Sequence, residues 1–144
     1  MTVGGILAGA DEKEVAKISA IAENIGMAFQ ITDDVLDIMQ TSEQIGKPAG
    51  NDIRQGIVTL PVIHALNVSP EAEELAAIVT DPEMDNEMVQ RALAIVRATD
   101  GVEVAKAKAD EYLERARQAI PAGLPAEIRD AFVQVADFIG DRDF

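Results

Sequence analysis

Three aspartates within five consecutive residues are the part of this sequence best suited to chemistry: Asp33, Asp34 and Asp37. In a helix, Asp33 and Asp37 share a face, and Asp34 is rotated by about 100° from Asp33. Hard divalent cations such as Mg²⁺ take carboxylate oxygens and usually share their coordination shell with substrate phosphates. The pattern therefore indicates a site where metal ions bridge aspartates to a diphosphate. An acidic helix end exposed to water is the alternative, and the pattern alone leaves both open.

A glycine-containing loop with a single lysine follows the aspartates. Lys47 lies between Gly46 and Pro48, where it could meet phosphate oxygens as a point charge. Gly46 and Gly50 allow close approach of the backbone to a ligand. Such a segment taken alone is usually an ordinary surface loop. Its position after three aspartates favours the functional interpretation.

Other metal sites do not match the spacing. A calcium-binding EF-hand loop needs glycine at its sixth position, and the sixth residue counted from Asp33 is Ile38. A ferritin-like di-iron site needs paired Glu-x-x-His elements, whereas the sequence has one histidine, His64. Because its neighbours are apolar, we interpret His64 as a packed helix residue.

Length and composition predict one all-α domain over residues 1–144. The chain has a mass of 15.4 kDa, enough for one domain with a core. It is 48% apolar but only 3% aromatic and has no cysteine. This composition favours helices over sheets and excludes thiolate sites.

The charge balance limits the possible partners. The net charge is −14, and such a surface repels nucleic acid and anionic lipid. A diphosphate substrate is still possible if metal ions invert the local sign. No signal peptide is visible, and no apolar run is long enough to cross a bilayer. We therefore expect a cytoplasmic protein with no transmembrane segment and no nucleic-acid partner.

Capping residues and apolar periodicity place the aspartates on a long helix. Asp11 is its expected N-cap, with Glu14 completing a capping box, and the helix is expected to end near Met39. Its expected apolar stripe comprises Val15, Ile18, Ala22, Ile25, Phe29, Thr32 and Leu36. We also expect a helix tail over 2–8, a loop over 41–51, a turn over 52–55, and helices capped by Thr59, Ser69 with Pro70, and Asp85, then over 102–118 and 126–139.

Three segments in this order closely resemble the second aspartate-rich motif of the trans-isoprenyl (polyprenyl) diphosphate synthases. They are FQITDDVLD at 29–37, GKPAGND at 46–52 and TLP at 59–61. The resemblance covers essentially the whole chain and implies the C-terminal portion of the isoprenoid-synthase helical bundle. The C-terminal end resembles the large component of two-component medium- and long-chain synthases.

The resemblance implies a magnesium site that acts on two diphosphate substrates. Asp33 would be the direct metal ligand, and Asp34 and Asp37 would bind Mg²⁺ or its waters. In this family an allylic diphosphate loses its diphosphate, isopentenyl diphosphate attacks the resulting carbocation, and a proton is then lost.

The resemblance also implies roles in substrate binding. Lys47 and Gln30 would act with Asp33 in catalysis by holding the allylic diphosphate. Phe29 would pack against isoprenoid carbon, and Asp52 would orient the loop as a second-shell residue.

Departures from the family pattern point to an incomplete site. The sequence contains no counterpart of the family's first aspartate-rich motif, and Ile57 stands where many members carry a lysine. We therefore expect a C-terminal fragment that is inactive alone and that forms a homo- or hetero-oligomer. The alternative is a non-catalytic helical partner subunit of a two-component prenyl synthase.

A substitution at Asp33 separates a metal site from a structural acid. Asp33→Ala should abolish Mg²⁺-dependent diphosphate binding with little loss of stability, because it removes one of three mutually repelling carboxylates. Calorimetric titration with diphosphate and urea unfolding measure the two quantities. A loss of several kcal/mol in unfolding free energy would instead mark a structural residue.

Overall fold

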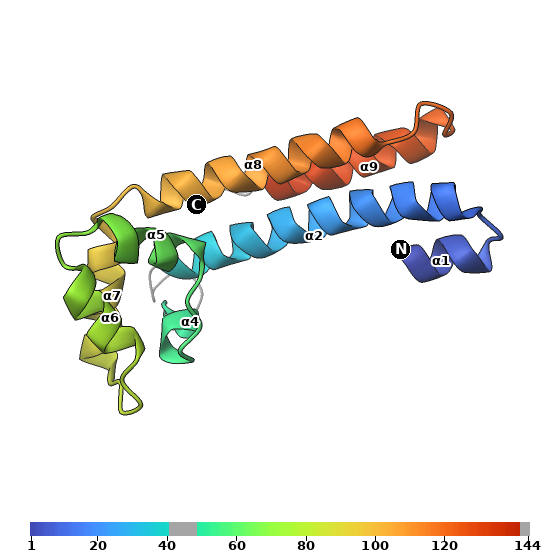
Figure 1. Ribbon diagram of the computed structural model, residues 1–144. Helices are drawn as coiled ribbons and strands as arrows, with labels where there is room; N and C mark the ends of the chain where they lie inside the picture. Colours follow the sequence, from blue (N-terminus) through green and yellow to red (C-terminus); the bar gives the residue numbers. More distant parts are fainter. Residues whose placement is uncertain (41–48, 142–144) are drawn as a thin grey trace. The chain divides into compact units, whose positions relative to one another are not determined.

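The computed structural model describes residues 1–40 and 49–141, and the regular elements in these ranges are helices (Figure 1). The expected all-α class is confirmed. The chain divides into two compact units, which we describe separately. The first comprises residues 1–30 with the described residues 108–141, and the second comprises residues 31–107. The unit boundaries fall within two helices, and the single domain over 1–144 stays a prediction.

The first unit is built from four helical segments. These are α1 (Thr2–Leu7), most of α2 (Glu12–Met39), most of α8 (Gly101–Ala119) and α9 (Ala126–Gly140). Within this unit, α8 and α9 run side by side, and α1 lies beside the beginning of α2 (Figure 1). An ion pair joins α8 to α9, with Arg117 Nη2 lying 2.7 Å from Asp137 Oδ1.

The expected capping box begins α2. Asp11 Oδ1 accepts the backbone amide of Glu14 at 2.9 Å, and the backbone amide of Asp11 donates to Glu14 Oε2 at 3.0 Å. These reciprocal bonds satisfy amides that have no partner within the helix. The helix ends at Met39 as expected. Of its expected apolar stripe, however, only Thr32 is buried, and the buried positions lie beside the stripe: Ile21, Ala28, Ile31, Val35 and Ile38.

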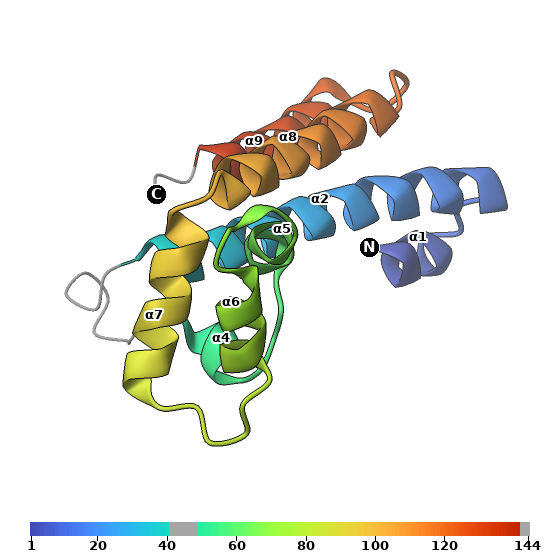
Figure 2. The ribbon, with the colours of Figure 1, turned by 60° about the vertical axis from the view of Figure 1, so that its left-hand side comes forward.

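The second unit packs four helices with the end of α2 and the beginning of α8. They are α4 (Asn51–Arg54), α5 (Leu60–Val68), α6 (Ala72–Val79) and α7 (Asn86–Arg97). Helix α7 packs against the other three (Figure 2). Its inward face is entirely apolar, because Val89, Leu93 and Val96 are fully buried. The N-cap prediction for this helix is confirmed, since Asp85 Oδ1 accepts the backbone amide of Met88.

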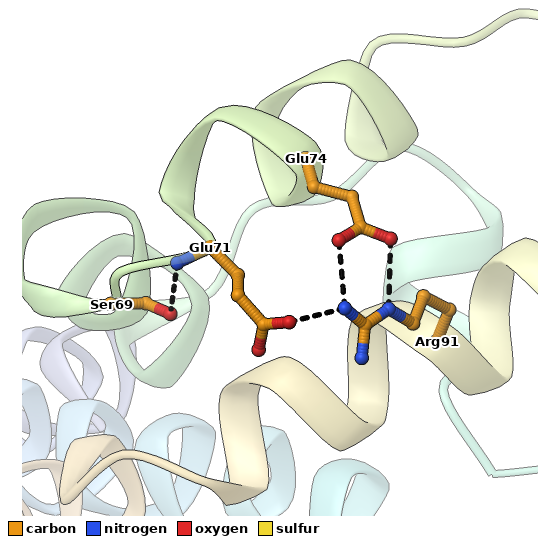
Figure 3. A network of polar contacts seen from close by, with 4 residues as sticks. All are labelled: Ser69, Glu71, Glu74 and Arg91. Carbon is orange, nitrogen blue, oxygen red and sulfur yellow. Dashed lines mark hydrogen bonds and ion pairs between the residues drawn. The ribbon is translucent and has the colours of Figure 1, made fainter.

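A surface ion-pair network joins α6 to α7 (Figure 3). Arg91 binds both oxygens of Glu74 with Nε and Nη2, at 2.8 and 2.7 Å, and its Nη2 also contacts Glu71. The arginine lowers the pKa of the Glu74 carboxyl through these hydrogen bonds.

The predicted start of α6 was wrong: Ser69 accepts the backbone amide of Glu71, so a turn precedes the helix, which begins at Ala72.

The caps of α5 also depart partly from expectation. Thr59 is the N-cap, but its hydroxyl makes no capping bond. His64 is not simply a packed residue, because its Nε2 lies 2.7 Å from Asp100 Oδ1, just before α8. Helices α5 and α8 approach closely at this contact, since a Cβ at Gly101 of α8 would lie 2.8 Å from the carbonyl oxygen of Pro61 in α5.

Within the described residues, none of the helices combines the length and apolar character that crossing a membrane requires.

Two glycines with the same backbone conformation provide a matched test of packing. Gly50 and Gly56 have φ of 75° and 73°. A Cβ at Gly50 would lie 2.9 Å from Val89 Cγ1, whereas among the described residues a Cβ at Gly56 would meet nothing within 4 Å. Gly56→Ala should cost about 1–2 kcal/mol from the left-handed backbone alone. Gly50→Ala should cost roughly 1–3 kcal/mol more through overpacking. Equal costs in urea unfolding would contradict the close packing.

The contact between His64 and Asp100 predicts an acid-dependent stability difference. The hydrogen bond from His64 lowers the pKa of the Asp100 carboxyl below its ordinary 3.8. A lowered pKa means that the stabilisation is fully present above the ordinary value and is lost as the pH falls through the lowered one. Wild type should therefore melt above His64→Ala at neutral pH, and the gap should shrink below about pH 4. Thermal melts across this range test it.

The control for this comparison is Gln90→Ala, at an exposed position of α7. Its difference from wild type should not depend on pH. A His64→Ala gap that widens as the pH falls below about 4 would contradict the prediction.

Candidate functional site

The acidic end of α2 has one buried face and one polar face. Ile31, Val35 and Ile38 are buried, and helical periodicity places them away from Asp33 and Asp37, with Asp34 at the border of the two faces. Asp33 is exposed, and Asp34 and Asp37 are half-buried. The apolar face therefore positions this helix end, and the polar face carries Asp33 and Asp37.

Asp37 binds three consecutive backbone amides at the start of α4. Its Oδ1 and Oδ2 accept the amides of Asn51 and Asp52 at 3.0 Å each, and its carbonyl oxygen accepts the amide of Gly50 at 3.1 Å. Gly50, the N-cap of α4, has no side chain that could do this. The end of α2 and the beginning of α4 are thus joined directly.

This junction brings Asp52 into the electrostatic field of the α2 aspartates. Burial raises the pKa of the Asp52 carboxyl above its ordinary value. The negative charges of Asp37, Asp34 and Asp33 raise it further, in that order. The site is therefore a region of concentrated negative charge, which a divalent cation would neutralise.

The carboxylates alone are not a complete metal cage. Among the described residues, no group of three acidic, histidine or cysteine side chains is arranged so that it could hold a metal ion. The donor set is nevertheless of the type that Mg²⁺ prefers, since this ion is usually bound by one or two carboxylates with water and phosphate oxygens. The residues fit a cation that is shared with a diphosphate.

Arg97 holds the last turn of the aspartate-bearing helix, and the sequence analysis did not identify it. Its Nε and Nη2 donate to the carbonyl oxygen of Ile38 at 2.8 and 2.5 Å, and Nη2 also donates to that of Gln40 at 3.2 Å. These carbonyls have no partner within the helix, and a cation is favourable at this end. Because Arg97 is distant in sequence, no local signal could have identified it.

The remaining sequence-predicted residues lie elsewhere. Phe29 and Gln30 are exposed on α2, one turn before Asp33, and belong to the first unit. Phe29 is 43% exposed, as a side chain that packs against ligand carbon would be. Lys47 lies outside the described residues.

The sequence profile of the family described as Polyprenyl synthetase matches residues 1–96. This chain belongs to the polyprenyl synthetase family. The match includes the aspartates of α2, the Asp37 contacts with α4, and α5 to α7 up to Val96.

Curated relatives from this family match almost the whole chain. Heptaprenyl diphosphate synthase component 2 of Geobacillus stearothermophilus is 41% identical over 99% of this chain and 44% of its own length. Nonaprenyl diphosphate synthase of Mycobacterium tuberculosis is 34% identical over 97% of this chain and 42% of its own length. The chain thus spans less than half the length of these relatives.

Solved structures agree with the family assignment. Heptaprenyl diphosphate synthase from Staphylococcus aureus aligns with a TM-score of 0.85 and 28% identity, over 99% of this chain and 45% of that one. A polyprenyl synthase from Caulobacter crescentus, solved with calcium and isoprenyl diphosphate, aligns with a TM-score of 0.83 and 30% identity, over 98% of this chain and 44% of that one. The expected isoprenyl-synthase helical fold is confirmed.

Proposed function

We propose that this chain supplies the second aspartate cluster of a trans-polyprenyl diphosphate synthase, which joins an allylic diphosphate to isopentenyl diphosphate. The observation that supports this is the acidic face of α2 joined through Asp37 to α4, in a chain of the polyprenyl synthetase family. The activity and substrates of the whole enzyme are part of this proposal, and a cytoplasmic location of the chain is part of it too.

In this proposal Asp33 holds Mg²⁺, and Asp34 binds the ion or its waters. The resemblance gives Asp37 the same role, which competes with the backbone contacts that its carboxylate makes. Bound there, Mg²⁺ would neutralise negative charge on the allylic diphosphate and make it a better leaving group. The related synthase solved with calcium and isoprenyl diphosphate supports a divalent cation in the family. The crowded charge around Asp52 supports a cation at this position.

The substrate would be held by residues before and after the aspartates. Gln30 and Lys47 would bind the allylic diphosphate, Phe29 would contact isoprenoid carbon, and Asp52 would lie at the start of α4. These residues would accelerate prenyl transfer by orienting the two substrates, because holding reactants in position lowers the activation barrier of the reaction.

A helical partner subunit is the second candidate, and exposed apolar side chains favour it. On α1, Val3, Ile6 and Leu7 are 69%, 60% and 83% exposed. On α9, Val135 and Phe138 are 48% and 68% exposed. Exposed apolar side chains in such numbers are typical of surfaces that associate with another protein. The Geobacillus relative is named as one component of its synthase. Both candidate functions, the catalytic fragment and the helical partner subunit, are consistent with a homo- or hetero-oligomer.

Prenyl transfer by the chain alone and with a partner distinguishes these candidates. The chain should show no turnover of labelled isopentenyl diphosphate when it is alone, because one aspartate cluster cannot hold the substrate from both sides. Co-expression with the segment of the Geobacillus relative that it does not match should give Mg²⁺-dependent turnover. Measurement is by extraction of labelled product.

The control is the same pair with Asp33→Ala. Loss of turnover supports a catalytic contribution from this chain, and retained turnover supports a non-catalytic partner. Robust transfer by the chain alone would contradict the incomplete-site interpretation.

A further inference from the structure

The carboxylate of Asp37 has a role in this structure that differs from that of Asp33. Both of its oxygens already accept backbone amides, from Asn51 and Asp52. Asp33, one turn earlier on the same face, is exposed to solvent. Two aspartates of one motif are thus in different environments, and different environments indicate different functions.

The start of α4 needs such an acceptor from outside the helix. The first amides of any helix lack intrahelical acceptors, and α4 has only four residues. Its N-cap, Gly50, makes no side-chain capping bond and has a left-handed φ of 75°. Asp37 supplies the missing acceptors from α2, and its negative charge is favourable at a helix N-terminus.

These contacts determine where Asp52 lies. The amide of Asp52 is one of the two that bind the Asp37 carboxylate. The Asp52 side chain is half-buried and within the electrostatic reach of Asp33 and Asp34. Within residues 1–40 and 49–141, the Asp37 carboxylate is the group of α2 that binds the amides of Asn51 and Asp52.

We propose that Asp37 is a positioning residue: by binding the amides of Asn51 and Asp52, its carboxylate holds Asp52 beside the α2 aspartates. The inference rests on the proposed function, because it assigns Asp37 an effect on diphosphate binding that acts through Asp52. Direct metal binding by Asp37 is the competing role.

The first measurement is hydrogen exchange of the Asn51 and Asp52 amides in the metal-free chain. Asp37→Asn replaces one acceptor oxygen by a donor, and a hydrogen bond to a charged group is worth about 1.5–3 kcal/mol. Exchange of these amides should therefore accelerate by about tenfold or more. Asp33→Asn is the matched control, since it removes the same charge from the same helix without touching these amides. The Val89 amide in α7 reports whether the unit stays folded.

The second measurement is a double-mutant cycle on Mg²⁺-dependent binding of inorganic diphosphate, by calorimetry. Asp37→Asn and Asp52→Asn should each weaken binding by about tenfold. The double variant should bind no more weakly than Asp52→Asn alone, because a residue acting through Asp52 has no effect once that carboxylate is gone. Additive losses would overturn the proposal and favour direct metal binding by Asp37.

The two measurements separate this inference from the proposed function. Unchanged amide exchange in Asp37→Asn would overturn the positioning role, whatever the binding result. A wild-type chain that binds no diphosphate with Mg²⁺ would remove the proposed function, and amide exchange would still decide whether Asp37 holds the start of α4.

Discussion

The bond between the Asp37 carboxylate and the amides of Asn51 and Asp52 is the interaction on which the candidate site depends. It joins the helix that carries the aspartates to the short helix that carries Asp52. A four-residue helix is not stable by itself, because nucleation costs more than so few internal bonds return. An external carboxylate at its N-terminus is therefore part of the reason that α4 exists.

Arg97 complements this interaction at the same end of α2. It binds the carbonyl oxygens of Ile38 and Gln40, at the end of a helix whose last carbonyls have no partner within the helix. The end of α2 and the start of α4 are thus each bound by a side chain. Both contacts come from backbone groups meeting side chains far away in the sequence, and both restrict where the carboxylates can move.

The aspartates carry an electrostatic cost that the apolar face of α2 offsets. Like charges four residues apart repel within a helix. Burial raises the pKa of the Asp52 carboxyl most, and the charges of the α2 aspartates raise it further by the same repulsion between elements. Ile31, Val35 and Ile38 bury the face of this helix end that lies away from Asp33 and Asp37. Burial of that face stabilises the helix while the charges stay concentrated. A cation shared with a diphosphate relieves this repulsion, which is the physical basis of the proposed function.

Local chemistry in the sequence determined the helices, most of their caps and the family. Asp11, Glu14 and Asp85 bind amides close to them in sequence, so their capping bonds were predictable from spacing alone. The start of α6 was not, because Ser69 forms a turn with Glu71 instead of a cap. The buried stripe of α2 was displaced from its predicted position, since the pattern does not specify which apolar residues meet a neighbouring helix.

The sequence by itself determined that Asp33 and Asp37 share a helix face, with Asp34 about 100° from Asp33, and that Asp52 follows in the same motif. Only the tertiary structure decided that Asp37 binds the start of α4, that Arg97 binds the end of α2, and that His64 meets Asp100. Helical periodicity is a local property of the chain, so the residues reveal it directly. The partner of a buried backbone group depends on how distant segments pack, and no local pattern specifies that.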